Sequence, residues 1–380
     1  MKYVIIRCED YARASSDTTP LLEGAKTVHL QHLAQAGAAG VIRRQPHEML
    51  VDRFQLHRAL FGLAPNDPEA APARCYAAGA NVPLAAGEIG WCCELITHRD
   101  GRIIDATAGD IPTKESEVLI RAINNQLGSE TRHWAVGDGS HHLLVLRDTS
   151  LKTPQEGRGC SSELLIGQDW KRSLPKGSAR APLQALIEQV SNILETHPVN
   201  RVRVDLGENP ANLIWLWGAA RGESQVSFHE RTGLSGAVVS HRFPMRGFAS
   251  CLGLDWRSGP TSLEEAPLRQ LLKGTAALIE RRDVVYVHLR IEDSDPVERL
   301  CVMERVDQLL LKPLTELLPS HGPWRVLVVV DDYLTGSVPW IAIGTGLPQH
   351  PVAHLDAQAL AESTLVYEDG VALFSWFTQQ

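Results

Sequence analysis

Three apolar stretches from distant parts of the chain share one pattern, in which a run of mostly β-branched residues ends near acidic side chains. The runs are Tyr3–Ile6, Val284–Val287 and Val326–Val330. Continuous apolar runs of this kind predict strands that are buried on both faces, as in a parallel sheet. Ligands bind at the carboxyl ends of such strands in open α/β sheets, so the acidic residues after the three runs are expected to converge on one site.

The acidic residues that follow the runs form a candidate site for one divalent cation, such as Mn²⁺ or Mg²⁺, because carboxylate oxygens are the ligands that these ions prefer. The candidate ligands are Glu9, Asp293, Asp331 and Asp332. In the alternative interpretation no metal is bound, and Arg7, Arg53 or Arg290 neutralises the carboxylates within a buried ion cluster. We favour this alternative, because buried carboxylates without a counter-charge are costly and an arginine supplies the charge.

The rest of the chain mixes strand and helix patterns, which predicts an α/β protein. Helices are expected around residues 29–36, where Gly37 is a plausible C-cap, and over residues 52–63. The next part of the chain is expected to mix strands and helices. The predicted strands are 90–97, 102–105 and 142–146, and the predicted helices are 116–126 and 182–196. Residues 149–180 are expected to be irregular. The alternation of strand, loop and helix restarts near residue 236 and is expected to continue to the end.

Residues 64–74 are rich in proline and alanine, which indicates a crossing into a second domain. The predicted core domain is discontinuous and consists of residues 1–71 and 226–380. Residues 72–225 form the predicted inserted domain, which is a smaller α/β unit.

Composition narrows the class of protein. Of the 380 residues, 44% are hydrophobic and 22% are charged, which is ordinary for a globular protein, and the net charge of −8 argues against nucleic acid or an anionic membrane as a partner. No apolar run approaches the ~20 residues of a membrane span, and the first residues predict a strand rather than a signal peptide. Seven cysteines without a CxxC pair predict a cytoplasmic protein with reduced thiols and argue against a structural zinc site.

Short motifs along nearly the whole chain share their order with those of one enzyme family. They are Glu9-Asp10, Thr19-Pro20 with Glu23 and Ala25, His197-Pro198-Val199-Asn200 with Arg203, Pro210-Ala211-Asn212, Met245-Arg246-Gly247, and Val285–Arg290. The chain thereby resembles the archaeal-type cofactor-independent phosphoglycerate mutases of the alkaline phosphatase superfamily. The resemblance implies a three-layer α/β/α core with an inserted substrate domain, and an isomerase related to glycolysis.

The resemblance also implies a two-metal site with an aspartate after the first strand, a serine nucleophile, and further aspartate and histidine ligands. Two metals about 4 Å apart would activate the serine and clamp the transferring phosphoryl group. The same resemblance places Arg246, Arg290 and His142 at substrate-binding positions.

The sequence departs from this pattern at most positions. Glu9 replaces the first aspartate, and the serine position falls on Arg53, whose guanidinium stays protonated and is no nucleophile. A register shift of one residue would place Asp52 there, and an aspartate can act as a nucleophile. Asp293 matches an aspartate ligand of the family, but the histidine that follows that aspartate in the family is missing here. At the position of the family's Asp-His pair this chain has Asp331-Asp332.

Two histidines flank Arg53 and are candidate replacement ligands or acid–base groups, namely His47 and His57. An ordinary hydrogen-bonded role explains each of them as well. The segments that match the family's substrate-binding arginines, such as 106–109 and 216–218, carry no arginine here, which should weaken the binding of a phosphorylated glycerate.

These departures predict a phosphoglycerate mutase-like protein with a degenerate two-metal site. Such a pseudoenzyme candidate would bind a small phosphorylated or anionic ligand, or a protein partner whose identity the sequence leaves open, in the old cleft. The alternative is a diverged, metal-dependent mutase or phosphoesterase with a rebuilt single-metal site. In that enzyme Asp52 or a metal-bound water would be the nucleophile, and Arg53 would hold the anion.

Overall fold

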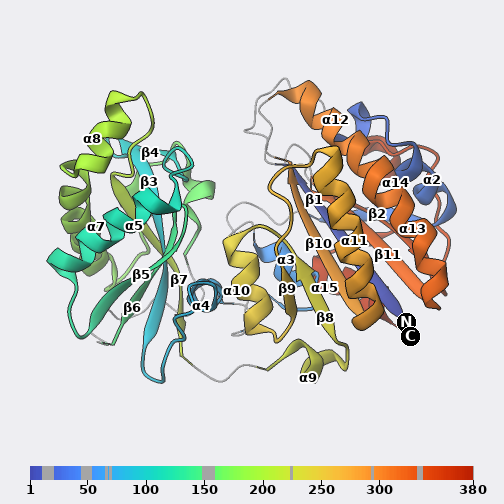
Figure 1. Ribbon diagram of the computed structural model, residues 1–380, viewed down its shortest axis with the longest axis horizontal. Helices are drawn as coiled ribbons and strands as arrows, with labels where there is room; N and C mark the ends of the chain where they lie inside the picture. The colour runs from blue at the N-terminus through green and yellow to red at the C-terminus, as the bar shows by residue number, and fades with distance from the viewer. Residues whose placement is uncertain are drawn as a thin grey trace.

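The computed structural model describes residues 1–10, 21–43, 54–64, 67, 71–147, 159–222, 226–291, 295–331 and 337–379. The described residues form two lobes, each built on its own β-sheet (Figure 1). One sheet takes its strands from both ends of the chain and the other from the middle. The domain boundaries given above remain a prediction.

The larger sheet has eight strands in the order β13-β2-β12-β11-β1-β10-β8-β9. Their bounds are β1 Lys2–Asp10, β2 Ala38–Arg43, β8 Gly236–Val239, β9 Asp255–Arg257, β10 Val284–Ile291, β11 Trp324–Asp331, β12 Ser337–Gly344 and β13 Val366–Tyr367. The three apolar runs found in the sequence form β1, β10 and β11, and β1 pairs in parallel with both of the others. Their carboxyl ends therefore meet at one edge of the sheet.

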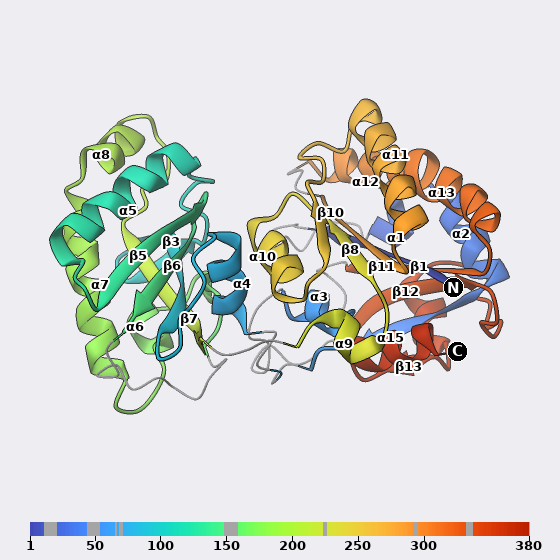
Figure 2. The same cartoon turned by 60° about the horizontal axis from the view of Figure 1, so that its bottom comes forward.

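Helices cover both faces of this sheet, which gives the lobe the predicted three-layer α/β/α architecture (Figure 2). Side chains alternate along β1, so Val4, Ile6 and Cys8 pack in one apolar cluster, and Tyr3 and Ile5 pack in the other. The first cluster includes side chains of α2 (Val28–Ala36), α11 (Glu265–Arg281), α12 (Pro296–Val306) and α13 (Lys312–Leu317). The second includes side chains of α10 (Phe243–Cys251) and α15 (Gly370–Thr378), with Leu60 and Phe61 just after α3 (Gln55–Ala59). Further short helices are α1 (Leu21–Gly24), α9 (Phe228–Thr232) and α14 (Ala357–Glu362).

The second lobe contains an antiparallel sheet with helices on both sides. Its strands are β3 Ile89–Arg99, β4 Arg102–Asp105, β5 Arg132–Asp138, β6 His141–Leu146 and β7 Leu213–Arg221. The helices α5 (Thr113–Leu127), α7 (Arg180–Glu195) and α8 (Pro198–Asp205) lie on the outer side, and α4 (Pro72–Gly79) lies on the side that faces the first lobe (Figure 2). None of the helices in the described ranges combines the length and the apolar composition that crossing a bilayer requires.

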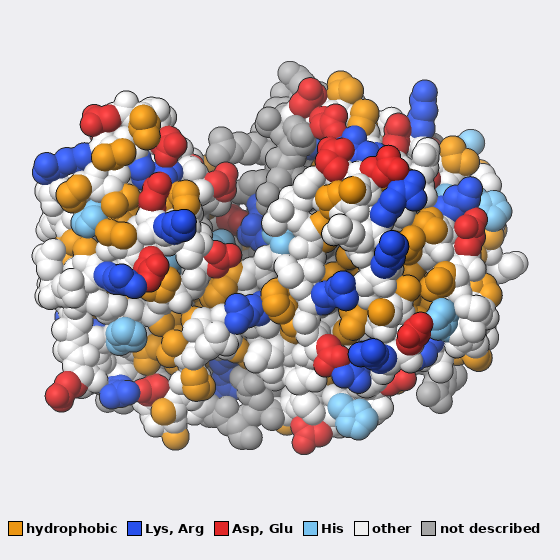
Figure 3. Space-filling model, viewed as in Figure 1, with side chains coloured by type: hydrophobic (Ala, Val, Ile, Leu, Met, Phe, Trp, Pro, Cys, Tyr) orange, Lys and Arg blue, Asp and Glu red, His pale blue; other side chains and the backbone are white. Residues whose placement is uncertain are grey.

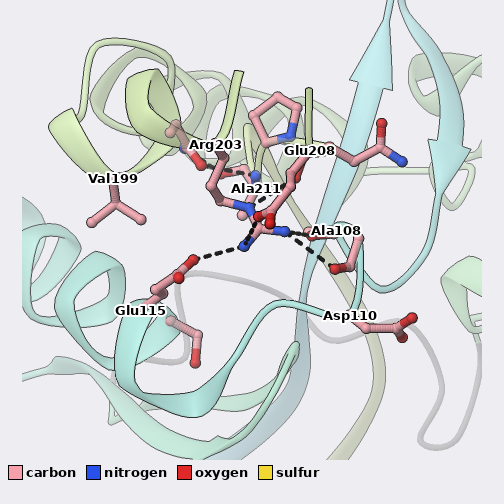
Figure 4. Close-up of polar contacts among 12 residues, drawn as sticks. Ala108, Asp110, Glu115, Val199, Arg203, Glu208 and Ala211 are labelled. Atoms are coloured by element: carbon pink, nitrogen blue, oxygen red, sulfur yellow. Dashed lines mark hydrogen bonds and ion pairs between the residues drawn. The ribbon is translucent and has the colours of Figure 1, made fainter. Parts of the chain in front are cut away.

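A buried arginine organises one end of the second lobe (Figure 4). Arg203, on α8, forms an ion pair with Glu115 at 2.7 Å and donates hydrogen bonds to the carbonyl oxygens of Ala108 and Gly109. Ala108 and Gly109 both have positive φ angles, and Asp105 accepts a hydrogen bond from the Gly109 N–H. The arginine that accompanies the His-Pro-Val-Asn motif thus holds a strained turn in place.

Two predictions about secondary structure need correction. The helix predicted over 52–63 is shorter, because α3 spans only Gln55–Ala59; residues 52 and 53 lie outside the described chain. The expected alternation of strand and helix fails after β11, which pairs with the next strand, β12, in antiparallel orientation. Antiparallel neighbours need no crossover helix, and Pro339 within β12 obscured the strand in the sequence.

The segment predicted to be irregular, 149–180, is partly helical. Its described residues include a 3₁₀ helix, Ser162–Leu165, and α6, Trp170–Ser173. Gly37 does follow α2, but its φ of −115° is not the left-handed conformation of a typical glycine cap. A Cβ atom there would lie 2.3 Å from the carbonyl oxygen of Ala342, so glycine is needed for close packing against β12.

Helices α4 and α10 provide the close contact between the two lobes. A Cβ atom added to Gly247 on α10 would lie 1.7 Å from the carbonyl oxygen of Cys75 on α4. Gly79 on α4 faces the ring of Phe243 in the same way, at 3.0 Å. The absence of side chains at these two positions lets the helix backbones approach and fixes how the walls of the interlobe cleft face each other.

We therefore expect Gly247→Ala to lower the thermal stability, because a methyl group on this backbone contact forces overpacking that typically costs about 1–3 kcal/mol. Gly274→Ala on α11 is the matched control, since the atoms nearest to its added methyl group belong to the flexible end of the Arg257 side chain. Alanine should be neutral or stabilising there, because it favours a helix interior by about 1 kcal/mol over glycine. Equal melting temperatures for Gly247→Ala and the wild type would contradict the contact.

Candidate functional site

A cleft lies between the two lobes; it is partly open to solvent and offers about 70 Å³ of space to the centres of water-sized molecules. Figure 3 shows the surface hollowed between the lobes. One wall comes from the lobe of the larger sheet and includes Glu9, His288 and Arg290 from its strands and His57 from α3; the opposite wall comes from the second lobe and includes Glu94. The cleft thus begins where the central parallel strands end, which is the position that an open α/β sheet favours for ligands.

The sheet wall is polar because alternate residues of β1 and β10 point to the same face. Arg7 pairs in register with His288, and Glu9 with Arg290. On the other side of β1, Glu9 is the register partner of Asp331. Two of the predicted carboxylates therefore lie on adjacent strands, as expected from the sequence.

A buried arginine contacts both of these carboxylates. The Nη2 atom of Arg7 lies 2.5 Å from Oδ2 of Asp331 and 3.7 Å from Oε2 of Glu9, and the Arg7 side chain is only 1% exposed. Burial acts to lower the pKa of Arg7, but the charges of Glu9 and Asp331 raise it, so the guanidinium remains charged. Burial likewise acts to raise the pKa of Glu9, and Arg7 together with the two neighbouring histidines holds it well below its ordinary value.

Two buried histidines approach the same oxygen of Glu9. The Nε2 atom of His288 is 3.0 Å from Glu9 Oε2, and that of His57 is 3.5 Å away. Burial and the charge of Arg7 lower the pKa of His57 well below its ordinary value, and burial lowers the pKa of His288 to about 4. Both rings are therefore neutral at pH 7.

A hydroxyl group holds the other ring nitrogen of each histidine. The Nδ1 atom of His57 is 2.6 Å from the Tyr286 hydroxyl, and that of His288 is 3.0 Å from the Ser240 hydroxyl. Neutral histidines in this arrangement accept from the hydroxyls at Nδ1 and donate from Nε2 to Glu9. The tyrosine comes from β10 and the serine directly follows β8, so neighbouring strands orient both rings.

The two-metal site implied by the family resemblance does not fit the described residues. Its ligands would include Glu9 and Asp331, but the Arg7 guanidinium already contacts both, and a fixed positive charge there opposes a pair of divalent cations. Of the other predicted groups, Asp52, Arg53, Asp293 and Asp332 lie outside the described residues, as does His47.

The opposite wall of the cleft carries a buried carboxyl group, that of Glu94 on β3. Its two oxygens accept hydrogen bonds from Tyr76 Oη at 3.1 Å, from Ser162 Oγ at 2.5 Å and from the Ser162 N–H at 3.1 Å. Burial outweighs these hydrogen bonds and raises the pKa of Glu94 to about 7. A carboxyl group that titrates near neutral pH can donate or accept a proton under physiological conditions.

The three predicted substrate-binding residues lie in different surroundings. Arg290 lines the cleft. Arg246 is exposed on α10, where its guanidinium lies 5.6 Å from the Trp256 ring centroid. His142 is buried in β6 and accepts a hydrogen bond from the Gly137 N–H, while its neighbour His141 lines the cleft.

Sequence reasoning missed His288, Glu94 and Arg242 as groups of the cleft. The first two carried a signal, because each is a polar residue within an otherwise apolar strand run: Val-Val-Tyr-Val-His-Leu and Ile-Gly-Trp-Cys-Cys-Glu-Leu-Ile. A single polar residue in a doubly buried strand has to be satisfied by hydrogen bonds or serve a site. Arg242 precedes α10 and carried no such signal.

Replacement of Glu94 tests its raised pKa. Because the folded protein holds this proton more tightly than the unfolded chain, stability should fall as the pH rises from about 4.5 to about 7. Glu94→Gln removes this dependence, so the variant should match the wild type near pH 4 and exceed it at pH 8 by up to about 3 kcal/mol, at 1.36 kcal/mol per pKa unit.

Urea denaturation at a series of pH values measures this difference. Glu130→Gln, which replaces an exposed glutamate, is the control and should follow the wild-type curve. A Glu94→Gln variant that is less stable than the wild type at pH 8 would show that the carboxylate is the favoured form.

Comparisons with known proteins agree with the motifs. The family model described as 2,3-bisphosphoglycerate-independent phosphoglycerate mutase matches residues 34–200. The mutase of that name from Methanosarcina mazei is 28% identical over 347 residues, which cover 87% of this chain and 85% of the relative. A probable mutase of the same name from Geobacter sulfurreducens is 27% identical over 401 residues and 98% of each chain.

Solved structures show the same fold. The cofactor-independent phosphoglycerate mutase from Thermoplasma acidophilum aligns over 100% of this chain and 99% of its own, with a TM-score of 0.60 and 22% identity. A Pyrococcus horikoshii protein aligns over 99% and 96% of the two chains, with a TM-score of 0.67 and 16% identity. The similarity in sequence to 2,3-bisphosphoglycerate-independent phosphoglycerate mutases thus extends along nearly the whole chain, and the solved structures show that the fold is shared.

Proposed function

We propose that this phosphoglycerate mutase-like protein binds an anionic ligand in the interlobe cleft and does not transfer phosphoryl groups by a two-metal mechanism. The observation that carries the proposal is the Arg7 guanidinium, which lies against both Glu9 and Asp331. An arginine cannot lose its proton in a protein, so its charge cannot be removed to admit a metal pair.

The arginine does not perform the chemistry of the metals it opposes. Two metal ions lower the pKa of a nucleophile and clamp the attacking and leaving oxygens. A guanidinium offers hydrogen bonds and one positive charge, and that of Arg7 is already engaged with Asp331 at 2.5 Å. The Arg7 guanidinium therefore neutralises the buried carboxylates and stabilises the fold, but it cannot replace the metals in phosphoryl transfer.

Two arginines give the cleft groups that can bind an anion. Arg242 and Arg290 both line it, together with the carboxyl groups of Glu9, Glu94 and Glu163. The charges of the arginines reach the opposite wall, where burial and these two arginines lower the pKa of His141 well below its ordinary value. A phosphate or carboxylate group between the walls would receive charge-assisted hydrogen bonds, which are the strongest that side chains offer such ligands.

A single-metal phosphoesterase is the second candidate. It is favoured by the two neutral histidines beside Glu9, because imidazole nitrogens are good ligands for transition metals. This function needs a nucleophile, and the residue proposed from the sequence, Asp52, lies outside the described chain.

The first proposal is tested by assaying the interconversion of 2- and 3-phosphoglycerate with Mn²⁺, with Mg²⁺ and with a chelator, and by measuring the binding of 3-phosphoglycerate and inorganic phosphate calorimetrically. We expect no turnover under any condition and measurable anion binding. Arg290→Gln should weaken binding about 10- to 100-fold, since a hydrogen bond to a charged group contributes roughly 1.5–3 kcal/mol.

Arg269→Gln serves as the charge control, because Arg269 is exposed on α11 and pairs only with the neighbouring Glu265 among the described contacts. Anion binding that Arg290→Gln leaves unchanged would contradict the assignment to the cleft. Turnover that requires Mn²⁺ and disappears in Asp331→Asn would establish the active enzyme instead.

A further inference from the structure

Three side chains with metal-ligating atoms meet on the sheet wall of the cleft. One ligand atom each from Glu9, His57 and His288 lies within 4.8 Å of the other two. All three residues are buried, at 7%, 3% and 3% exposure, and all three line the cleft. They come from β1, α3 and β10, so the fold rather than local sequence brings them together.

From this geometry we propose that Glu9, His57 and His288 bind one divalent transition-metal ion, with a coordination position open to the cleft. Two imidazoles and one carboxylate are a ligand set that suits Zn²⁺, and Co²⁺ as its spectroscopic substitute. Three protein ligands leave at least one position for water or for an oxygen of a bound anion.

The surroundings of the histidines fit this role. Metal-ligating histidines almost always use their second ring nitrogen in a hydrogen bond that fixes the ring. Here Tyr286 and Ser240 occupy Nδ1 of His57 and His288, which leaves each Nε2 directed at Glu9. Since a hydroxyl group donates or accepts equally well, it can accept from Nδ1–H and leave the Nε2 lone pair for the metal.

The charges also permit one metal ion. Arg7, Glu9 and Asp331 together carry a formal net charge of −1. Arg7 is much closer to Asp331 than to Glu9, so Glu9 can bind a metal while the arginine stays paired with Asp331. The oxygen that Glu9 would offer is Oε2, which also lies 3.7 Å from Arg7 Nη2, so the guanidinium lowers the affinity of the site for an ion without occupying the ligand position.

This inference deepens the proposed function, because the open position faces the cleft in which the anion is expected. It concerns metal binding and not turnover, so the two proposals can fail separately. A protein that binds Zn²⁺ without converting phosphoglycerates satisfies both, and a protein that binds phosphate but no metal satisfies only the first.

The test uses the full chain, dialysed against a chelator and then titrated with Zn²⁺ or Co²⁺. We expect one ion per chain by elemental analysis, a higher melting temperature with Zn²⁺, and visible absorption from Co²⁺ in a site with few ligands. Glu9→Gln, His57→Gln and His288→Gln should each abolish stoichiometric binding. Tyr286→Phe and Ser240→Ala should weaken it about 10- to 100-fold, as is usual for residues that orient a metal ligand.

His133→Gln is the matched control, because this histidine is exposed on β5 in the other lobe. Circular dichroism establishes that each variant is folded. Should a ligand variant unfold, X-ray absorption of the Zn²⁺-loaded wild type decides, since two imidazole ligands give a distinctive scattering pattern. Absence of a stoichiometric ion, binding that survives replacement of both histidines, or a spectrum without imidazole scattering would overturn the proposal.

Discussion

The polar end of the central sheet depends on the burial of one positive charge beside two negative ones. A carboxylate alone in this environment would be several kcal/mol less stable than in water, and Arg7 supplies the compensating charge for Glu9 and Asp331. The parallel pairing of β1 with β10 and β11 forces this solution, because it brings the ends of all three strands to the same edge. His57 and His288 approach the buried carboxylate of Glu9, and the hydroxyl groups of Tyr286 and Ser240 hold these two rings in place.

The second constraint is the close approach of α4 and α10. Because backbone meets backbone at Gly247, the lobe that carries Glu94 lies at a fixed distance from the lobe that carries Glu9. Tyr76, which donates to Glu94, is itself on α4, so the helix that joins the lobes also builds the second wall. The same helix, α4, therefore both packs against the first lobe and supplies a hydrogen bond to Glu94 in the cleft.

The sequence was sufficient for the central strands and for the fold class, because long apolar runs and ordered motifs are local signals. It also indicated that Glu9 and Asp331 would lie together and that an arginine such as Arg7 would neutralise them. It was insufficient for His288 and Glu94, whose roles arise from contacts with residues far away in the chain. Strand β12 was missed because Pro339 interrupts its apolar pattern, and only its pairing with β2 and β11 shows it to be a strand.

The raised pKa of Glu94 has a consequence for whatever anion enters the cleft. A negative ligand beside this group stabilises the protonated carboxyl, which can then donate a hydrogen bond instead of repelling the ligand. Occupancy and protonation are thermodynamically linked, so near neutral pH the protein takes up a fraction of a proton when it binds an anion. Through this group, affinity for the anion declines as the solution becomes alkaline, and the effect adds to that of the titration of a phosphate ligand itself.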